Sequence, residues 1–421
     1  MVRGNADLQG KFAQLTVPNP LSDEGDATQE GREDKTNMVY VIDGLLDLTL
    51  GVQPCPEFNL RMAACECIKS YFFKHSDIRR HFLSRAIEGH LADRDETGNI
   101  LTILLNPSPR LATSDPYGIW FAAIIMFHLV YNDPTAKASA MAITEGDVSS
   151  GEEVVTSIQA ITSHLISGLS RGDNPRVLVA YVILLLGWLF EDPDGVNDFL
   201  GEGSHVQGLI QAVTQPAEGV DEIVRGLCAM LLGVVYDFST KDSPIPRATL
   251  QPILLARMGR DKYLDRLANL RAHPFIRDFE VTPQKLDGSS SGKLADVYFD
   301  DTFVEFLKDN YSRIARAIDR DPDLETPVMA NGVEKGVSRE LVDSLRAQLE
   351  EKESAIQDMQ RALDSLRHEL LQEQENSRAA RGAASRDIAK LKDANDTLRR
   401  EYEDGIRYSC PCRQAPRSIM L

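Results

Sequence analysis

Cysteine, tryptophan and basic residues are all scarce in this sequence of 421 residues. It has six cysteines and two tryptophans, and 46 lysines and arginines stand against 64 aspartates and glutamates. The formal net charge of −18 argues against a nucleic-acid-binding protein, whose binding surface is basic, and against a generally basic membrane-binding surface. We therefore expect no nucleic-acid partner, although an acidic chain can still bind a basic protein.

The few cysteines do not form the pattern of a disulfide-rich or zinc-binding domain. Cys65 and Cys67 form one close pair and Cys410 and Cys412 another, without the further pair or histidine cluster that completes a zinc site. Residues 1–7 also lack the apolar stretch of a secretory signal. We therefore expect a reducing, cytosolic compartment, no disulfide framework, no metal site and no cofactor. The first cysteine pair is expected in the core and the second in a frayed tail.

Apolar runs long enough to span a membrane are also missing. The run Val177–Phe190 is apolar on every side, with Asn174-Pro175 before it and Asp192-Pro193 after it. A spanning helix needs about 20 apolar residues, so this run is too short. A helix that is apolar all round must be surrounded by other helices. The run therefore predicts the central buried helix of a helical stack.

Three other segments repeat this arrangement of a buried helix, a closing aromatic residue, a polar turn and a further helix. The closing aromatics are Phe73, Tyr131, Phe190 and Tyr236. Their intervals are 58, 59 and 46 residues, and polar insertions at Asp93–Asn99 and Thr144–Glu153 explain the two longer ones. Armadillo and HEAT repeats run about 40–47 residues. The pattern predicts an all-α fold, an armadillo-like solenoid followed by a coiled-coil helix.

Composition divides the chain into four parts. Residues 1–37 are rich in proline, glycine, aspartate and asparagine, and we expect them to be mostly loop or disordered. Residues 38–332 form the expected helical head. Residues 333–405 form the expected coiled coil, and residues 406–421 are expected to be a disordered tail because the heptad pattern stops there.

Apolar residues recur at heptad spacing beyond Ser338, where aromatic residues nearly vanish. The expected dimerisation seam consists of Val342, Leu345, Leu349, Ile356, Met359, Leu363, Leu366 and Leu370. A sustained a/d pattern of this kind predicts a parallel coiled coil, and therefore a homodimer. After Leu370 the heptad pattern is interrupted by a stutter, which locally unwinds the supercoil, and the seam resumes at Ile388.

Two short motifs resemble enzyme signatures, but their context does not fit the chemistry. Gly168-Leu-Ser170-Arg-Gly172 matches the nucleophile-elbow pattern, yet the preceding residues predict a helix where that motif needs a strand. Asp287–Leu294 resembles a phosphate loop that is one residue short and lacks the hydroxyl residue that binds Mg²⁺. His128 lies in an apolar helix and is expected to be a satisfied core histidine. We therefore expect no catalytic residue.

Two other functions remain as alternatives. A generic armadillo adaptor would bind a protein partner in its solenoid groove and would need asparagines and tryptophans along that groove, one set per repeat. Only Trp120 and Trp188 are present, which disfavours this interpretation. A serine hydrolase centred on Ser170 would need a parallel sheet, for which the sequence shows no strand pattern.

Four segments resemble the general vesicular transport factor family, Golgi tethers with an armadillo head and a long coiled-coil tail. They are Phe12–Pro18, Tyr40–Leu50, Val177–Leu200 and Phe303–Leu307. The similarity covers roughly Lys11–Pro322 and, more loosely, the coiled coil. Family members have further armadillo repeats before the point matching Lys11 and a longer coiled coil with an acidic end beyond Tyr408. The resemblance therefore implies a partial chain, the second half of a head and the first segment of a tail.

This resemblance also implies a function. It suggests a homodimer that docks vesicles to Golgi membranes in ER-to-Golgi and intra-Golgi transport, before SNARE-mediated fusion. The implied partners are a Rab GTPase, SNAREs and other Golgi tethering proteins. The implied location is cytoplasmic and peripheral on the Golgi membrane. No catalytic residue transfers, because the family has no known active site.

Overall fold

The computed structural model describes residues 2–18, 38–51, 57–92, 98–108, 114–146, 154–216, 219–279, 294–323 and 339–408. Contacts divide the chain into two units, Met1–Lys335 and Gly336–Leu421. The phosphate-loop-like segment 287–293, Cys410 and Cys412 lie outside the described residues.

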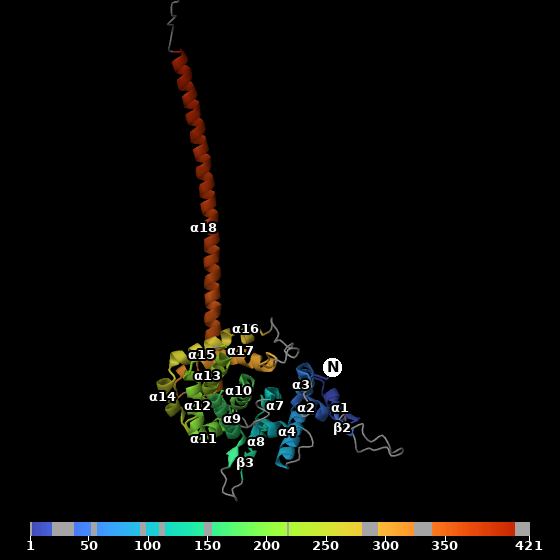
Figure 1. Ribbon diagram of the computed structural model, residues 1–421. Helices are drawn as coiled ribbons and strands as arrows, with labels where there is room; N and C mark the ends of the chain where they lie inside the picture. The colour runs from blue at the N-terminus through green and yellow to red at the C-terminus, as the bar shows by residue number, and fades with distance from the viewer. Residues whose placement is uncertain are drawn as a thin grey trace, which may run out of the picture. The chain divides into compact units, whose positions relative to one another are not determined.

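The first unit is built almost entirely of helices, which follow one another in chain order across the unit up to α15 (Arg260–Ala272), after which α17 (Asp301–Ala315) lies back against the middle of it (Figure 1). They are α1 (Ala6–Ala13), α2 (Val41–Leu50), α3 (Phe58–Phe72), α4 (Ser76–Leu91), α5 (Ile100–Leu105), α7 (Pro116–Val130), α8 (Pro134–Met141), α9 (Ser157–Arg171), α10 (Pro175–Leu189), α11 (Pro193–Gly201), α12 (Gly203–Thr214), α13 (Val220–Phe238), α14 (Arg247–Arg257), α15 (Arg260–Ala272), α16 (Pro274–Arg277), α17 (Asp301–Ala315) and the 3₁₀ helix η4 (Ala317–Asp319). Two short antiparallel pairs join β1 (Thr16–Pro18) to β2 (Met38–Tyr40) and β3 (Thr144–Glu145) to β4 (Val155–Thr156). The all-α prediction is confirmed.

The helix α10 is the centre of the hydrophobic core. Every residue from Arg176 to Leu189 is buried, and α7 and α13 pack against it. Helix α7 is similarly enclosed, with His128 as its one residue that is not fully buried. Gly187 lets α10 approach α7 closely, because a Cβ there would lie 2.4 Å from the Phe127 ring. The predicted central buried helix is thus confirmed.

The helices α3, α7 and α10 end in the same kind of turn. An aromatic residue closes the helix, a residue with a left-handed backbone follows, and the next residue caps the next helix. The left-handed residues are Lys74, Asn132 and Glu191, with φ of 54°, 56° and 55°. Such a backbone is uncommon outside glycine. Its recurrence at three equivalent places shows the repeat that the sequence intervals predicted.

A ladder of side-chain hydrogen bonds links neighbouring repeats. In α1, α4 and α8, the residue four positions after the N-cap donates to the carbonyl of an aromatic residue that closes a helix of the next repeat. The bonds are Lys137 Nζ to Phe190 O at 2.6 Å, Arg79 Nη1 to Tyr131 O at 3.1 Å, and Gln9 Nε2 to Phe73 O at 2.9 Å. These donors satisfy carbonyls that a helix end leaves without an intrahelical partner.

The ladder explains a helix that was not expected from the sequence. Residues 1–37 were expected to be mostly loop, but Ala6–Ala13 forms α1. The Asn5 side chain caps it by accepting from the Leu8 amide at 3.1 Å, and Gln9 is buried against the end of α3. Helix α1 therefore occupies the position that α4 and α8 occupy in later repeats. Residues 19–37 lie outside the described residues.

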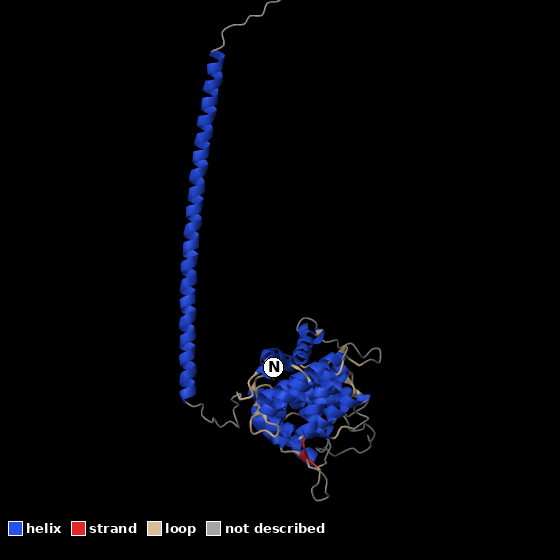
Figure 2. Cartoon of the chain, turned by 90° about the vertical axis from the view of Figure 1, so that its left-hand side faces the viewer, coloured by secondary structure: helices blue, strands red, loops and turns tan. Residues whose placement is uncertain are grey.

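The described part of the second unit is a single helix, α18 (Arg339–Tyr408), of 70 residues (Figure 2). It continues through the alanine-rich stretch and extends three residues beyond the expected end of the coiled coil at 405. From Met359 to Ile406 its side chains are exposed. Among the helices that the structure describes, none is both long enough and apolar enough to cross a membrane.

Candidate functional site

An extended segment crosses the buried helices and carries the side chains of the site. This strap, residues 294–300, has no regular secondary structure, yet Val297 and Phe299 are each 1% exposed. Trp120 Nε1 donates to the Tyr298 carbonyl at 3.0 Å, and the Arg176 guanidinium donates to the Ala295 carbonyl at 2.5 Å. Side chains of α7 and α10 thus satisfy backbone groups that would otherwise be buried without a partner.

The strap ends in an ion cluster centred on the buried ammonium of Lys69 of α3. Its ammonium lies 2.6 Å from Asp300, 2.8 Å from Asp301 and 2.7 Å from Glu66. His128 Nε2 lies 3.1 Å from the other oxygen of Asp300. The cluster joins the end of the strap to α3 and α7.

Burial destabilises the charged forms of Asp300 and Lys69, and the charged groups around each of them offset that effect. Burial alone would raise the pKa of Asp300, but the charges of and hydrogen bonds from His128 and Lys69 hold it well below its usual range. Burial likewise lowers the pKa of Lys69, but Asp300, Glu66 and Asp301 outweigh that effect and raise it. Asp300 and Lys69 are therefore both ionised at neutral pH.

The same cluster contains the atoms of a possible metal site. Ligand atoms of His128, Asp300 and Asp301 lie within 4.8 Å of one another. However, the Lys69 ammonium already contacts both carboxylates. It supplies the positive charge that a metal would bring, so the residues fit an ion cluster better than a metal centre. His128 is satisfied by Asp300, as expected for a core histidine.

Helix α17 lies against the ends of the buried helices. The Phe306 ring contacts the rings of Tyr131 and Phe190 at centroid distances of 5.7 and 5.0 Å. Arg313 Nε lies 2.8 Å from the buried carboxylate of Asp237, and its Nη1 lies 3.1 Å from Glu191. The closing turns of the repeats therefore form a surface that binds a helix of the same chain.

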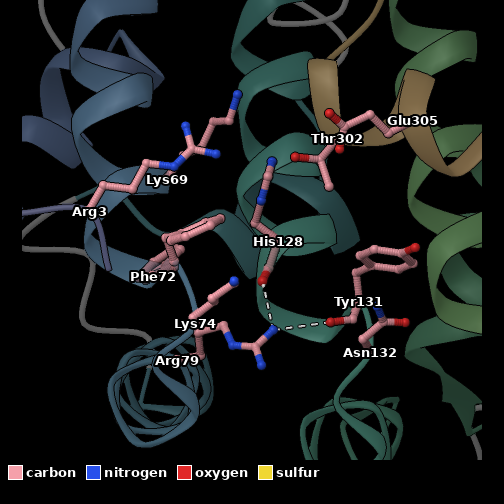
Figure 3. Close-up of a pocket in the computed structure, with 11 residues that line it drawn as sticks. Arg3, Lys69, Phe72, Lys74, Arg79, His128, Tyr131, Asn132, Thr302 and Glu305 are labelled. Carbon is pink, nitrogen blue, oxygen red and sulfur yellow. Dashed lines mark hydrogen bonds between the residues drawn. The ribbon is translucent and has the colours of Figure 1, made fainter. Parts of the chain in front are cut away.

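A pocket of about 280 Å³ opens beside the first turn of α17 (Figure 3). Four basic side chains line it, from Arg3, Lys69, Lys74 and Arg79. Glu305 is the only acidic side chain among its lining residues in the described structure. Figure 3 shows Lys74 and Arg79 below the backbone carbonyl of His128, with the Tyr131 turn opposite. The pocket is thus lined mainly by positive charge in a chain whose net charge is −18.

The predicted seam residues all lie on α18. The side chains of Ile356, Met359, Leu363, Leu366 and Leu370 are 51–61% exposed in the single chain. The side chains of Val342, Leu345 and Leu349 are outside the described residues. An apolar stripe exposed along a long helix is what a second helix would cover in a coiled coil.

The other residues singled out from the sequence are structural. Ser170 lies in the last turn of α9, where its hydroxyl donates to the Ile166 carbonyl at 3.0 Å. Trp120 and Trp188 are both buried in the core. They do not line an open peptide groove, which argues further against the adaptor.

One expectation about the cysteines was wrong. Cys65 is buried, and burial raises the pKa of its thiol, so it is a packing residue. Cys67 was also expected in the core, but it is exposed. The physical reason is their spacing, because residues two apart on a helix point in different directions.

The strap, the ion cluster and the pocket were missed from the sequence. Asp300 and Asp301 do carry a signal, because acidic residues just before an apolar helical pattern are typical of a helix start. Asp300 indeed caps α17 by accepting from the Thr302 and Phe303 amides. Nothing in the pattern indicates its pairing with Lys69, far away in the sequence.

Known proteins resemble this chain in sequence and fold. Residues 5–318 match the family described as "Uso1 / p115 like vesicle tethering protein, head region". Intracellular protein transport protein USO1 of Saccharomyces cerevisiae is 27% identical, over 89% of this chain and 22% of that protein. General vesicular transport factor p115 of Homo sapiens is 24% identical, over 62% of this chain and 26% of that protein.

The fold similarity covers the head. A solved structure described as "Crystal structure of Uso1-2" superposes with a TM-score of 0.64 and 25% identity, over 76% of this chain and 48% of that one. The chain spans about a fifth to a quarter of the length of the curated relatives it matches. The armadillo-like head is thereby confirmed.

Proposed function

Because the chain belongs to the family of Uso1/p115-like vesicle tethering proteins, we propose that it is a non-enzymatic tethering factor in ER-to-Golgi and intra-Golgi transport. Its relatives are named for intracellular protein transport and for general vesicular transport. The observation that carries the proposal is the match of residues 5–318 to the tethering head. On this proposal the chain is cytoplasmic and peripheral on Golgi membranes, where it docks vesicles before SNARE-mediated fusion.

Dimerisation through α18 is the second part of the proposal. Its apolar stripe keeps heptad spacing, and burying one leucine side chain stabilises by about 1.5–3 kcal/mol. At 1.5 Å per residue, a continuous helix of 70 residues is about 105 Å long. Two such helices would join two heads through a rod long enough to hold membranes apart. We propose residues 333–405 as this coiled coil and 38–332, extended by α1, as the head.

Partners would bind to the solenoid surfaces of the paired heads. Stacked helical repeats present extended surfaces for protein partners. The proposed partners are a Rab GTPase, SNAREs and other Golgi tethers. Because two linked heads bind together, contacts that are weak one at a time can hold a vesicle.

The seam can be tested by replacing Leu363 and Leu366 with glutamate in the full chain. Each wild-type chain has a mass of 46.8 kDa, and we expect light scattering to show twice that mass for wild type and the single-chain mass for the double variant. Glutamate at both positions places charges in the apolar seam.

The matched control replaces Ser365 and His368 with glutamate. These residues lie on the same turns of α18 but outside the seam, so the control should remain dimeric. A dimeric Leu363/Leu366 variant would show that the seam is assigned wrongly. A monomeric wild type would show that this length of α18 does not dimerise the chain. The second result would refute tethering through paired heads for this chain, whereas the first would refute only the assignment of the seam.

A further inference from the structure

The aromatic residues that end the buried helices form a row, and α17 covers only part of it. The row is Phe73, Tyr131, Phe190 and Phe238, at the ends of α3, α7, α10 and α13. Phe306 packs on the second and third rings, and Arg313 lies over the third and fourth at 5.3 and 4.7 Å. Helix α17 begins at Asp301, and the pocket lies beside this first turn, next to Phe73. The pocket therefore continues the row at a position that α17 leaves uncovered.

Charge at this uncovered turn is opposite to charge at the covered one. In the α10 turn, the left-handed residue is Glu191, which pairs with Arg313 of α17. In the α3 turn, the equivalent residue is Lys74. The Lys74 ammonium and the Arg3 guanidinium both lie over the Phe73 ring, at 5.4 and 4.3 Å. Within the described part of the chain, neither of these cations has a carboxylate within the 4.0 Å of an ion pair.

Arg79 at the base of the pocket is also incompletely partnered. It donates to the Tyr131 carbonyl at 3.1 Å and lies 3.5 Å from Asp133. Its Nε is buried and has no hydrogen-bond partner among the described residues. Burial lowers the pKa of Arg79, and Asp133 offsets that effect only partly. By contrast, Lys69 is already balanced by three carboxylates.

We propose that this pocket is a docking site for an acidic segment of a partner protein. A carboxylate of the partner would pair with Lys74 and Arg3, and a neighbouring apolar side chain would pack on Phe73. The arrangement repeats, with inverted charge, the way in which α17 binds the later turns through an ion pair and aromatic contacts. A volume of about 280 Å³ accommodates side chains of this size but not a folded element. The partner's contact is therefore a short peptide segment.

This docking site is independent of α18, so its test does not need the dimer. The probe is a fluorescein-labelled pentapeptide with leucine at the centre and glutamate at the four other positions. Its binding to the full chain is measured by fluorescence anisotropy at low ionic strength, where charge interactions are least screened. The same peptide with glutamine in place of glutamate should bind at least about tenfold more weakly, because charged hydrogen bonds are roughly twice as strong as neutral ones.

The repeats themselves supply variants that preserve the turn. Lys74→Glu introduces the residue found at the equivalent position 191, and Lys74→Asn the residue found at 132, both with the same left-handed backbone. We expect Lys74→Glu to weaken peptide binding by about tenfold or more, and Lys74→Asn by less, because only the first adds repulsion. Lys11→Glu is the control, since it changes net charge equally at an exposed residue of α1 that does not line the pocket.

Several outcomes would overturn the proposal. They are absence of binding at about 1 mM peptide, the weak end of measurable affinities, and equal weakening by Lys74→Glu and Lys11→Glu. Complete displacement of the peptide by equimolar inorganic phosphate would show a site for a small ion only. If Lys74→Glu does not fold, unchanged binding by Lys74→Asn also refutes the proposal. None of these results depends on whether the chain is a dimer. Failure of the docking proposal can therefore be distinguished from failure of the tethering proposal.

Discussion

Removal of the Asp300 carboxylate tests whether the ion cluster holds the strap and α17 on the head. Asp300→Ala deletes the contacts of this side chain with Lys69 at 2.6 Å and with His128 at 3.1 Å. It also deletes the cap of α17. Breaking a buried ion pair by removing one partner costs about 3–5 kcal/mol, and losing a cap costs about 1 kcal/mol. Since one side chain makes all of these contacts, the two costs overlap. We therefore expect Asp300→Ala to lower the free energy of unfolding by about 4 kcal/mol.

The adjacent residue provides the control. Asp301 also contacts Lys69, at 2.8 Å, but its side chain is 50% exposed. Asp301→Ala should therefore cost less than about 1 kcal/mol, as for other solvent-exposed ion pairs. The assay is urea unfolding followed by tryptophan fluorescence, which reports on the strap because Trp120 donates to the Tyr298 carbonyl. Equal losses for the two variants, or a loss below about 1 kcal/mol for Asp300→Ala, would refute this account of the cluster.

The pH dependence of Asp300→Ala gives a second check. The pKa of Asp300 in the folded protein is held below its usual value of 3.8. As the pH falls toward 3.8, the unfolded state therefore binds a proton at this carboxylate before the folded state does. The stability that Asp300 contributes is then fully present above this pH and is lost as pH falls further. The difference in unfolding free energy between wild type and Asp300→Ala should therefore shrink as the pH falls below about 4.

Two further predictions concern the core. Gly187→Ala should lower the free energy of unfolding in urea by about 1–3 kcal/mol, because the new Cβ would lie 2.4 Å from the Phe127 ring. The control Gly44→Ala, with nothing within 4 Å of the new Cβ, should stabilise α2 by up to about 1 kcal/mol. An unchanged stability of Gly187→Ala would show that α7 and α10 can separate to accommodate the new methyl group. Burial lowers the pKa of Lys137 from 10.5 to about 8, so between these values the folded state binds fewer protons and stability rises with pH. Relative to Lys137→Met, wild type should gain roughly 2 kcal/mol from pH 8 to 10 in the same unfolding assay, and a constant difference would contradict a depressed lysine pKa.

Much of the fold could be predicted because its signals are local. The run Val177–Phe190 is apolar on every side, and only a helix surrounded by other helices can accommodate it. The closing aromatics indicated the repeats, and each of the first three indeed ends a helix, although only α7 and α10 are buried almost throughout and α3 is about half buried. The fourth, Tyr236, lies inside α13, which continues to Phe238. Heptad spacing likewise predicted the long helix α18.

The candidate site could not be predicted because its residues are brought together only by the fold. Lys69 and Asp301 are separated by 232 positions, and no periodic pattern connects them. The strap is apolar but too short and irregular to indicate a helix or a strand. Helix α1 was missed because the composition of its region suggested loop, while its position depends on one buried side chain, Gln9, that reaches the end of α3.

The attachment of the last head residues also determines how the protein would bear mechanical load. Among the described head residues that hydrogen-bond to other helices of the head, Arg320 stands nearest in sequence to α18. The Arg320 carbonyl accepts hydrogen bonds from the Tyr236 hydroxyl at 2.8 Å and from Gln251 Nε2 at 2.9 Å, and its guanidinium pairs with Asp237. A force that reaches the chain at Arg320 would therefore act on α13 and α14 before it acted on α7 and α10.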